Sequence, residues 1–304
     1  MRKFLGTLFI CIVVLFFAGC FFGITGLMTD LNMKEAKVSE PSILFLRLEG
    51  VILDGEEFLS QLKKYSKQED IKGILVQVNS PGGVVGPSQE IYREIQRVRE
   101  ELKKPVVMSC LGMAASGAYY AAVGADKIVV NPGSLMGSIG VIMEFANLEK
   151  LYDWAKIQRY VIKTGNYKDS GAEYREMRDD ERQLFQAMAD EVLEQFRKAV
   201  AEGRKLSPAV VEKYSDGRVF TGATAVALGF ADSVGTLEDA KRIVGQLSGL
   251  GEDPKLFTPP PKRPEFLEEF FASRALKNEW DVISHLAKVK LLGQPLFLMP
   301  GVFR

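Results

Sequence analysis

The sequence predicts an α/β fold in which a mainly parallel sheet is covered by helices and follows an N-terminal transmembrane helix. Three observations support this prediction. Apolar runs of strand length alternate with segments whose apolar residues recur at helical spacing. Residues 71–80 (IKGILVQVNS) are apolar almost throughout, which is typical of a strand buried on both faces of a sheet. Ahead of these elements, residues 4–28 form an apolar run without a charge.

The first half of the chain gives a β-α-β rhythm, which favours a parallel sheet with helices packed on it. Residues 43–52 are expected to form a strand, and residues 56–67 a helix. The strand at 71–80 is followed by a helix at 87–104, whose terminal lysine pair suits the negative end of a helix dipole. A small-residue helix should start near Ser116. Further strands are expected at four places: PVVMSCL (105–111), KIVVN (127–131), GVIM (140–143) and RYVIKT (159–164).

The second half begins with a long amphipathic pattern at 179–206, which predicts a helix that packs on the sheet or on another subunit. Residues 219–235 predict a turn, a small-residue helix and a short strand. Residues 251–304 are expected to be a Pro-rich linker, then an amphipathic helix within 265–292, then a tail. The apolar end PLFLMPGVFR (295–304) is open to three interpretations: a packing tail, a segment that docks in an active-site groove, or a membrane contact.

The N-terminus is predicted to be an uncleaved anchor. An apolar run of this length spans a bilayer core of roughly 30 Å, and the preceding Arg2 and Lys3 keep the N-terminus in the cytoplasm. A cleaved signal peptide and a lipoprotein signal ending at Cys20 are the alternatives. The expected organisation is therefore a cytoplasmic N-terminus and anchor (1–30), a linker (31–42), a catalytic domain (43–250) and the C-terminal segment (251–304), with the catalytic domain outside the cytoplasm.

Composition excludes several classes of function. The formal net charge is zero, and no basic run with interleaved aromatics occurs, so a nucleic-acid-binding surface is not expected. The single histidine, His285, rules out a metal site built from several histidines. Two of the three cysteines lie in the apolar N-terminus, and there is no CxxC motif, so neither an internal disulfide nor a zinc site is predicted. The remaining cysteine, Cys110, is interpreted as a buried apolar residue.

Four segments are candidates for the chemistry: NSPGG (79–83), AASGAYY (114–120), NPGSLMGSIGV (131–141) and KTGNYKDSG (163–171). On its own, PGG after a buried strand is a turn, and Ser116 before a small-residue helix is an N-cap. The functional interpretation is that backbone N–H groups at this sheet edge bind an oxyanion beside a nucleophilic serine. A serine needs a base, and lysine is an established alternative to histidine. Such a lysine must lose its proton, which burial favours. Lys168, amid glycines after a predicted strand, is a candidate for that role and also fits a surface lysine.

In this order, the four segments resemble the signal peptide peptidase A family (peptidase family S49), Ser-Lys proteases of the bacterial envelope. The resemblance covers about residues 43–240 and extends to DGRVFTGATAVALGFADSVG (216–235). It implies a ClpP/crotonase-like spiral of ββα units. It also implies that Ser116 is the nucleophile, Lys168 the general base, Gly83 and Gly117 the oxyanion donors, and Ser138 a residue that orients the lysine. Two positions depart from the family: Ala118 replaces a common second glycine, and GFAD (229–232) replaces Gly-Leu-Val-Asp.

The resemblance further implies a homo-oligomeric ring or dome in which neighbouring chains supply Ser116 and Lys168. The expected function is a membrane-anchored serine endopeptidase that degrades cleaved signal peptides and other extended apolar peptides. No metal, ATP or other cofactor and no nucleic acid is expected. The location would be the inner (cytoplasmic) membrane with an extracytoplasmic catalytic domain. Two alternatives remain: a non-catalytic envelope scaffold that binds peptides, and a cytosolic acyl-CoA enzyme of the crotonase type.

Overall fold

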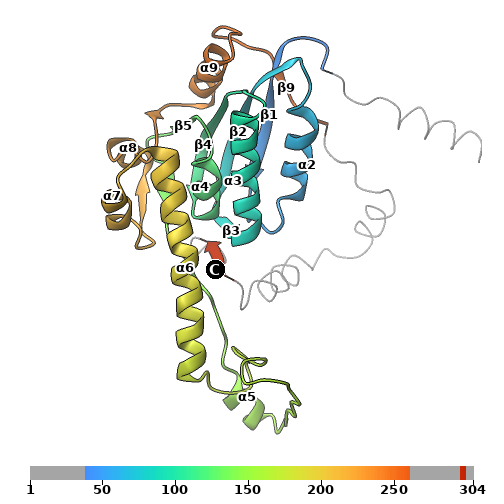
Figure 1. Ribbon diagram of the computed structural model, residues 1–304, viewed down its shortest axis with the longest axis vertical. Helices are drawn as coiled ribbons and strands as arrows, with labels where there is room; N and C mark the ends of the chain where they lie inside the picture. Colours follow the sequence, from blue (N-terminus) through green and yellow to red (C-terminus); the bar gives the residue numbers. More distant parts are fainter. Residues whose placement is uncertain (1–37, 261–294, 299–304) are drawn as a thin grey trace, which may run out of the picture. The chain divides into compact units, whose positions relative to one another are not determined.

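The structure, a computed structural model, describes residues 38–260 and 295–298. The predicted anchor, His285 and the predicted helix within 265–292 lie outside these residues. The described elements of the unit Glu40–Arg304 alternate strands and helices (Figure 1). In chain order they are β1 Ser42–Glu49, α2 Glu56–Tyr65, β2 Ile71–Ser80, β3 Gly82–Val84, α3 Val85–Glu100, β4 Val106–Ala115, α4 Gly117–Ala122, β5 Lys127–Val130, β6 Leu135–Gly137, α5 Glu149–Trp154, α6 Asp179–Arg204, α7 Pro208–Lys213, β7 Val219–Thr221, α8 Gly222–Ala227, β8 Ser233–Val234, α9 Leu237–Leu247, β9 Leu256–Phe257 and β10 Leu296–Leu298.

The main sheet is mixed, as an α/β fold with one antiparallel edge requires. Its strands run in the order β7-β6-β4-β2-β1-β9, with β5 and β8 branching from β4. All pairs are parallel except β6 with β7. Long β4 serves two neighbours, because its first half pairs with β5 and its last three residues pair with β6. The carboxyl ends of β2, β4 and β6 therefore meet at one edge, where ligands of parallel sheets bind.

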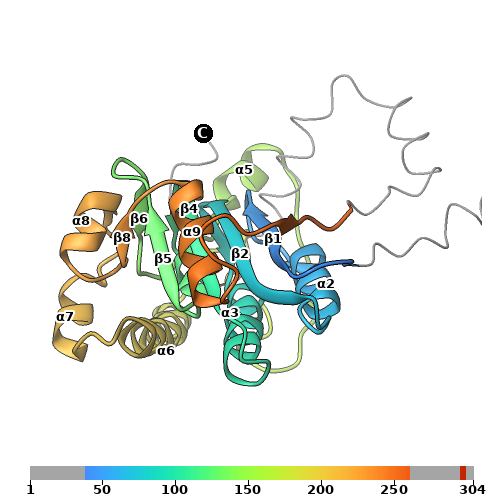
Figure 2. The same ribbon diagram turned by 90° about the horizontal axis from the view of Figure 1, so that it is seen from above.

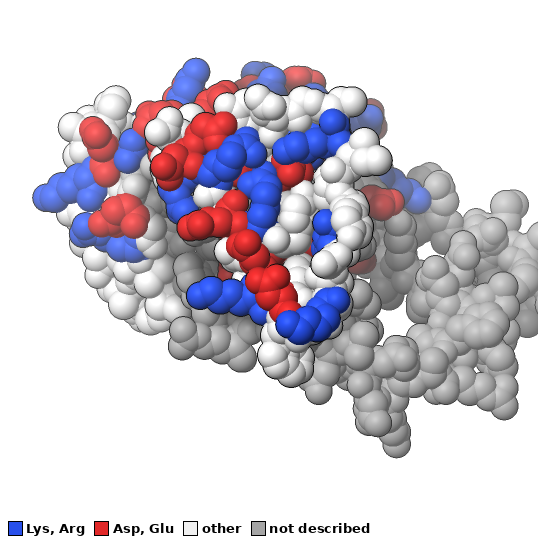
Figure 3. Space-filling model, turned by 90° about the horizontal axis from the view of Figure 1, so that it is seen from below, with Lys and Arg blue, Asp and Glu red and all other residues white. Residues whose placement is uncertain are grey.

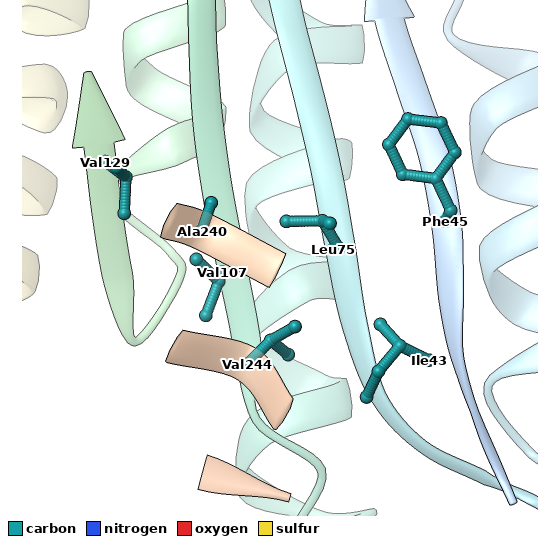
Figure 4. Packing of buried hydrophobic residues seen from close by; sticks show 7 residues of the cluster. All are labelled: Ile43, Phe45, Leu75, Val107, Val129, Ala240 and Val244. Atoms are coloured by element: carbon teal, nitrogen blue, oxygen red, sulfur yellow. The ribbon is translucent and has the colours of Figure 1, made fainter. Parts of the chain in front are cut away.

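Helices cover both faces of this sheet (Figure 2). On one face, α9 places Ala240 and Val244 on Leu75, Val107 and their neighbours, which form an apolar cluster drawn in Figure 4. Helices α2 and α3 cover the other face. Both faces of β2 and β4 are buried, which explains the nearly continuous apolar runs of these strands. Burying a side chain of the size of Val or Leu contributes about 1.5–3 kcal/mol, so the central strands hold the site's framework rigid.

An arm extends from this layered body. Helix α6 runs past the sheet at its C-terminal half, and α5 with the loop that follows lies at its other end (Figure 1). The strand predicted at 159–164 is absent, because these residues have no neighbouring strand within the described chain. The strand predicted at 140–143 is reduced to one isolated bridge at Ile142. Within the described residues, no helix combines the length and hydropathy that crossing a membrane requires.

Candidate active site

Ser116 occupies a strained corner between β4 and α4. Its backbone φ is 54° and its ψ is −119°, a conformation that an L-residue adopts only under constraint, at a cost of about 1–3 kcal/mol. Its N–H donates to Gly137 O at 2.8 Å, which ties the corner to β6. The residue is 1% exposed. Strain of this kind is typical of a catalytic nucleophile on a sharp strand-to-helix turn.

The side chain of Ser116 does not cap helix α4. Its hydroxyl accepts no capping hydrogen bond. Among the described residues, Ser116 Oγ is a buried polar atom with no hydrogen-bond partner at all. Because such an atom costs free energy unless it serves another purpose, the hydroxyl is available for chemistry rather than for structure. The interpretation of Ser116 as an N-cap is therefore wrong.

Gly83 and Gly117 lie together beside this corner. A Cβ placed on Gly117 would lie 3.2 Å from the backbone N of Gly83, and one placed on Gly82 would lie 2.6 Å from the backbone N of Gly117. Gly82 has a φ of 96°, which favours glycine, and it turns the chain sharply out of β2. The N–H of Gly117, the first residue of α4, has no acceptor within its own helix. The structure thus brings together both backbone groups that the sequence analysis assigned to an oxyanion hole.

Ser138 lies next to the same corner. It directly follows Gly137, whose carbonyl accepts the Ser116 N–H, and it is 3% exposed. Its own N–H donates to Arg218 O at 2.8 Å, and its φ is 51°. The end of β6 therefore holds a second constrained and buried serine beside the first, as the proposed lysine-orienting role requires.

A groove beside the corner holds a segment of the chain itself. Strand β10 pairs antiparallel with β3, with Phe297 opposite Gly83. On its other side, Leu296 exchanges two backbone hydrogen bonds with Ile142, of 3.0 and 3.1 Å. The carbonyl oxygen of Phe297 would lie 2.2 Å from a Cβ on Gly82, so only glycine permits this approach. An extended peptide therefore fits between β3 and Ile142, with its backbone against the Ser116–Gly117 corner.

The groove has an aromatic pocket that the sequence analysis did not identify. The fully buried ring of Phe297 stacks on Tyr120 at 5.1 Å and contacts Phe196 at 4.7 Å between ring centroids. Tyr120 belongs to α4 and Phe196 to α6. The YY pair after the serine was visible in the sequence, but its partner on α6 lies 76 residues further along the chain. Only the tertiary fold brings the two walls of the pocket together.

Lys168 is not brought to Ser116 within one chain. It is exposed and lies on the arm, in the turn just before α6. This turn is bonded to the start of α6, since Ser170 Oγ donates to Glu181 Oε1 at 3.1 Å. The Ser116 corner instead lies near Phe196, fifteen residues along the same helix, because Phe196 contacts Tyr120. At a rise of 1.5 Å per residue these places are about 22 Å apart, beyond the reach of a four-carbon side chain.

Cys110 is not a competing nucleophile. It lies on β4 and is 1% exposed. Burial raises the pKa of its thiol to about 12, so the reactive thiolate is scarce at neutral pH. Its assignment as a buried apolar residue is confirmed.

Comparison with known proteins identifies the family. The sequence model of Peptidase family S49 matches residues 99–251, and that of Clp protease matches residues 37–134. A provisionally named protease from Synechocystis sp. is 40% identical over 190 residues, which are 62% of this chain and 68% of that protein. The chain belongs to peptidase family S49. It is a serine protease of that family, and its α/β mixed sheet is of the ClpP/crotonase type.

Two further members of the group show how the match is distributed. A provisionally named signal peptide peptidase from Enterococcus faecium is 32% identical over 226 residues, 70% of this chain and 65% of that protein. A chloroplastic serine protease from Arabidopsis thaliana is 33% identical over 202 residues, 66% of this chain but 30% of its own length. The S49 match begins within α3 and includes Ser116, Ser138 and Lys168. The Clp protease match includes the glycine turn of β3 and also Ser116.

Proposed function

We propose that this protein is a membrane-anchored endopeptidase that cleaves extended apolar peptides, including released signal peptides, in the cell envelope. The supporting observation is the seat of β10: a short apolar segment lies antiparallel on β3, inserts an aromatic ring into a pocket and places its backbone at the Ser116 corner. Main-chain pairing gives affinity for any extended peptide, and the pocket selects apolar side chains. The anchor at 1–30 would hold the groove close to peptides left in the bilayer.

In this proposal, Ser116 and Lys168 form the catalytic dyad. The Lys168 amine takes the proton of Ser116 Oγ as the oxygen attacks the peptide carbonyl. The N–H groups of Gly83 and Gly117 bind the oxyanion of the tetrahedral intermediate, where one such donor is worth about 10²–10³-fold in rate. Protonated Lys168 then donates to the leaving amine, and water hydrolyses the acyl-enzyme by the same steps in reverse order of roles.

Because one chain keeps Lys168 away from its own Ser116, the dyad would form between neighbouring chains of a ring. The arm offers the surface for this. Its exposed side chains include Trp154 (80% exposed), Tyr160 (85%) and Ile162, which is fully exposed. Large apolar side chains gathered in this way mark an interaction site. A neighbouring chain that covers them would also desolvate Lys168 beside the serine.

The decisive test is hydrolysis of an apolar signal-peptide-like substrate by the full chain in detergent. Ser116→Ala and Lys168→Ala should each lose at least about 10³-fold in kcat while they stay folded and assembled. Ser109→Ala on the same strand and Lys150→Ala on the same arm are the matched controls and should retain activity. Equal cleavage by all five proteins would show that the activity has another source. Tight peptide binding without cleavage by the wild type would favour the scaffold alternative.

A further inference from the structure

The turn that carries Lys168 is held from two sides. It runs between Gly165 and Gly171, which have φ values of 80° and 75°. Gly171 packs against the ring of Phe145, since a Cβ placed there would lie 2.4 Å from that ring. The other side of the turn is charged: Asp169, the residue directly after Lys168, lies within a cluster of ion pairs that reaches the first turn of α6.

One side chain, Arg175, joins the two ends of this cluster. Its Nη2 donates to Asp169 Oδ1 at 3.0 Å and to the Asp169 carbonyl oxygen at 2.9 Å. The same guanidinium donates to both carboxylate oxygens of Glu181, at 2.6 and 2.9 Å. Arg175 is mostly covered, with a side chain that is 23% exposed. A planar fork of five N–H groups can serve two carboxylates and a carbonyl at once, which an ammonium group cannot match.

Glu181 anchors the cluster to the helix. Its side chain is fully buried, and it accepts from Arg178 N at 2.9 Å as the third residue of α6. It also accepts from Ser170 Oγ, two residues beyond Lys168. Helix α6 continues from there to Phe196, which forms a wall of the aromatic pocket. Arg175 therefore links the Lys168 turn to the rigid element that also shapes the peptide groove.

We propose that Arg175 is a positioning residue for the general base: by holding Asp169 against Glu181, it fixes the direction in which Lys168 leaves the arm. The inference rests on the proposed function, because it takes Lys168 as the base. Positioning matters at this level, since a displacement of about 1 Å costs about 10²-fold in rate. The charges of this side of the molecule are interleaved in sign, so the cluster satisfies itself rather than attracting a charged partner (Figure 3).

The test compares Arg175→Gln with Arg159→Gln in the full chain in detergent. Arg159 lies on the same arm and pairs with Glu173, but it does not contact Asp169 or Glu181. Arg175→Gln should lower kcat by about 10²-fold and leave KM within about twofold, because the peptide groove is built elsewhere. Arg175→Lys should recover only part of the loss. Arg159→Gln should match the wild type.

A second measurement separates positioning from general damage. The slow acylation of Ser116 by a fluorophosphonate is followed in the Lys168→Ala background, where Arg175→Gln should have no further effect. A further loss there, or a rise in KM that accounts for the whole defect, would overturn the proposal. If Arg175→Gln does not assemble, Asp169→Asn replaces it and should lower kcat by about tenfold; an unchanged kcat would equally reject the idea. A fully active Lys168→Ala enzyme would instead refute the dyad itself.

Discussion

At the scale of single residues, the most informative feature is that the fold holds Ser116 in a backbone conformation that suits glycine. The positive φ, the orphaned hydroxyl and the hydrogen bond from its N–H to Gly137 belong to one device. They expose Oγ at the end of β4 without letting the side chain relax into a cap. Backbone strain of this kind persists only where the surrounding structure enforces it, here through the pairing of β4 with β6.

This strain predicts a trade between stability and activity. Ser116→Gly removes the Cβ that makes a φ of 54° costly, so the variant should be inactive yet more stable than the wild type by about 1 kcal/mol. Ser116→Ala keeps the Cβ and should be inactive without this gain. Ser109→Gly, on the same strand, should lose about 0.5–1 kcal/mol as an ordinary strand glycine does. Thermal unfolding of the four proteins decides; a destabilised Ser116→Gly would mean that the corner is not strained.

At the scale of elements, the sequence predicts well whatever depends on local pattern. Strands β1, β2, β4 and β5 and helices α2, α3 and α6 lie where apolar periodicity places them, with shifts of a few residues at their ends. The segment 159–164 has the composition of a strand but lacks a partner in the described chain, and a strand needs one. Ile142 forms a bridge only because Leu296 reaches it from the far end of the chain.

The candidate site divides in the same way. Ser116, Gly83, Gly117 and Ser138 come together because β2, β4 and β6 all end at one edge of the sheet, which follows from a parallel arrangement. The position of Lys168 does not follow, because it depends on where a long helix points and on ion pairs of the arm. The aromatic pocket was missed for a similar reason, since its walls come from α4 and α6 and its occupant from β10.

The start of α6 should respond to acid. Hydrogen bonds from Arg175 lower the pKa of Glu181 to about 2, and they hold the pKa of Asp169 well below its usual range. A carboxylate with a lowered pKa stabilises the fold fully above its unfolded pKa, which is about 4.3 for Glu, and this contribution is lost as the pH falls towards 2. The wild-type melting temperature should therefore decrease across this window.

Glu181→Gln removes that titration and tests its origin. The variant should melt lower than the wild type at pH 7, and the difference between them should narrow from pH 4 to pH 2.5. Glu191→Gln, at an exposed position of the same helix, controls for the loss of one carboxylate. A difference that stays constant over the whole range would mean that the acid response of the wild type arises elsewhere.

At the scale of the whole molecule, one chain holds two halves of different active sites. The body carries the nucleophile, the oxyanion donors and the peptide groove, while the arm carries Lys168 on a turn clamped about 22 Å away along α6. A monomer with this geometry has no base at its serine. The exposed apolar side chains of the arm supply the contact through which a second copy could bring one.

This division predicts that two inactive variants restore each other. Ser116→Ala and Lys168→Ala chains, unfolded together and co-assembled in equal amounts, should regain about a quarter of wild-type activity, because random mixing in a closed ring puts an intact serine beside an intact lysine at one site in four. The same variants assembled separately and mixed without exchange should stay inactive. So should Ser116→Ala co-assembled with the double variant. A site completed within one chain would give no recovery in any mixture, since neither chain then carries both groups.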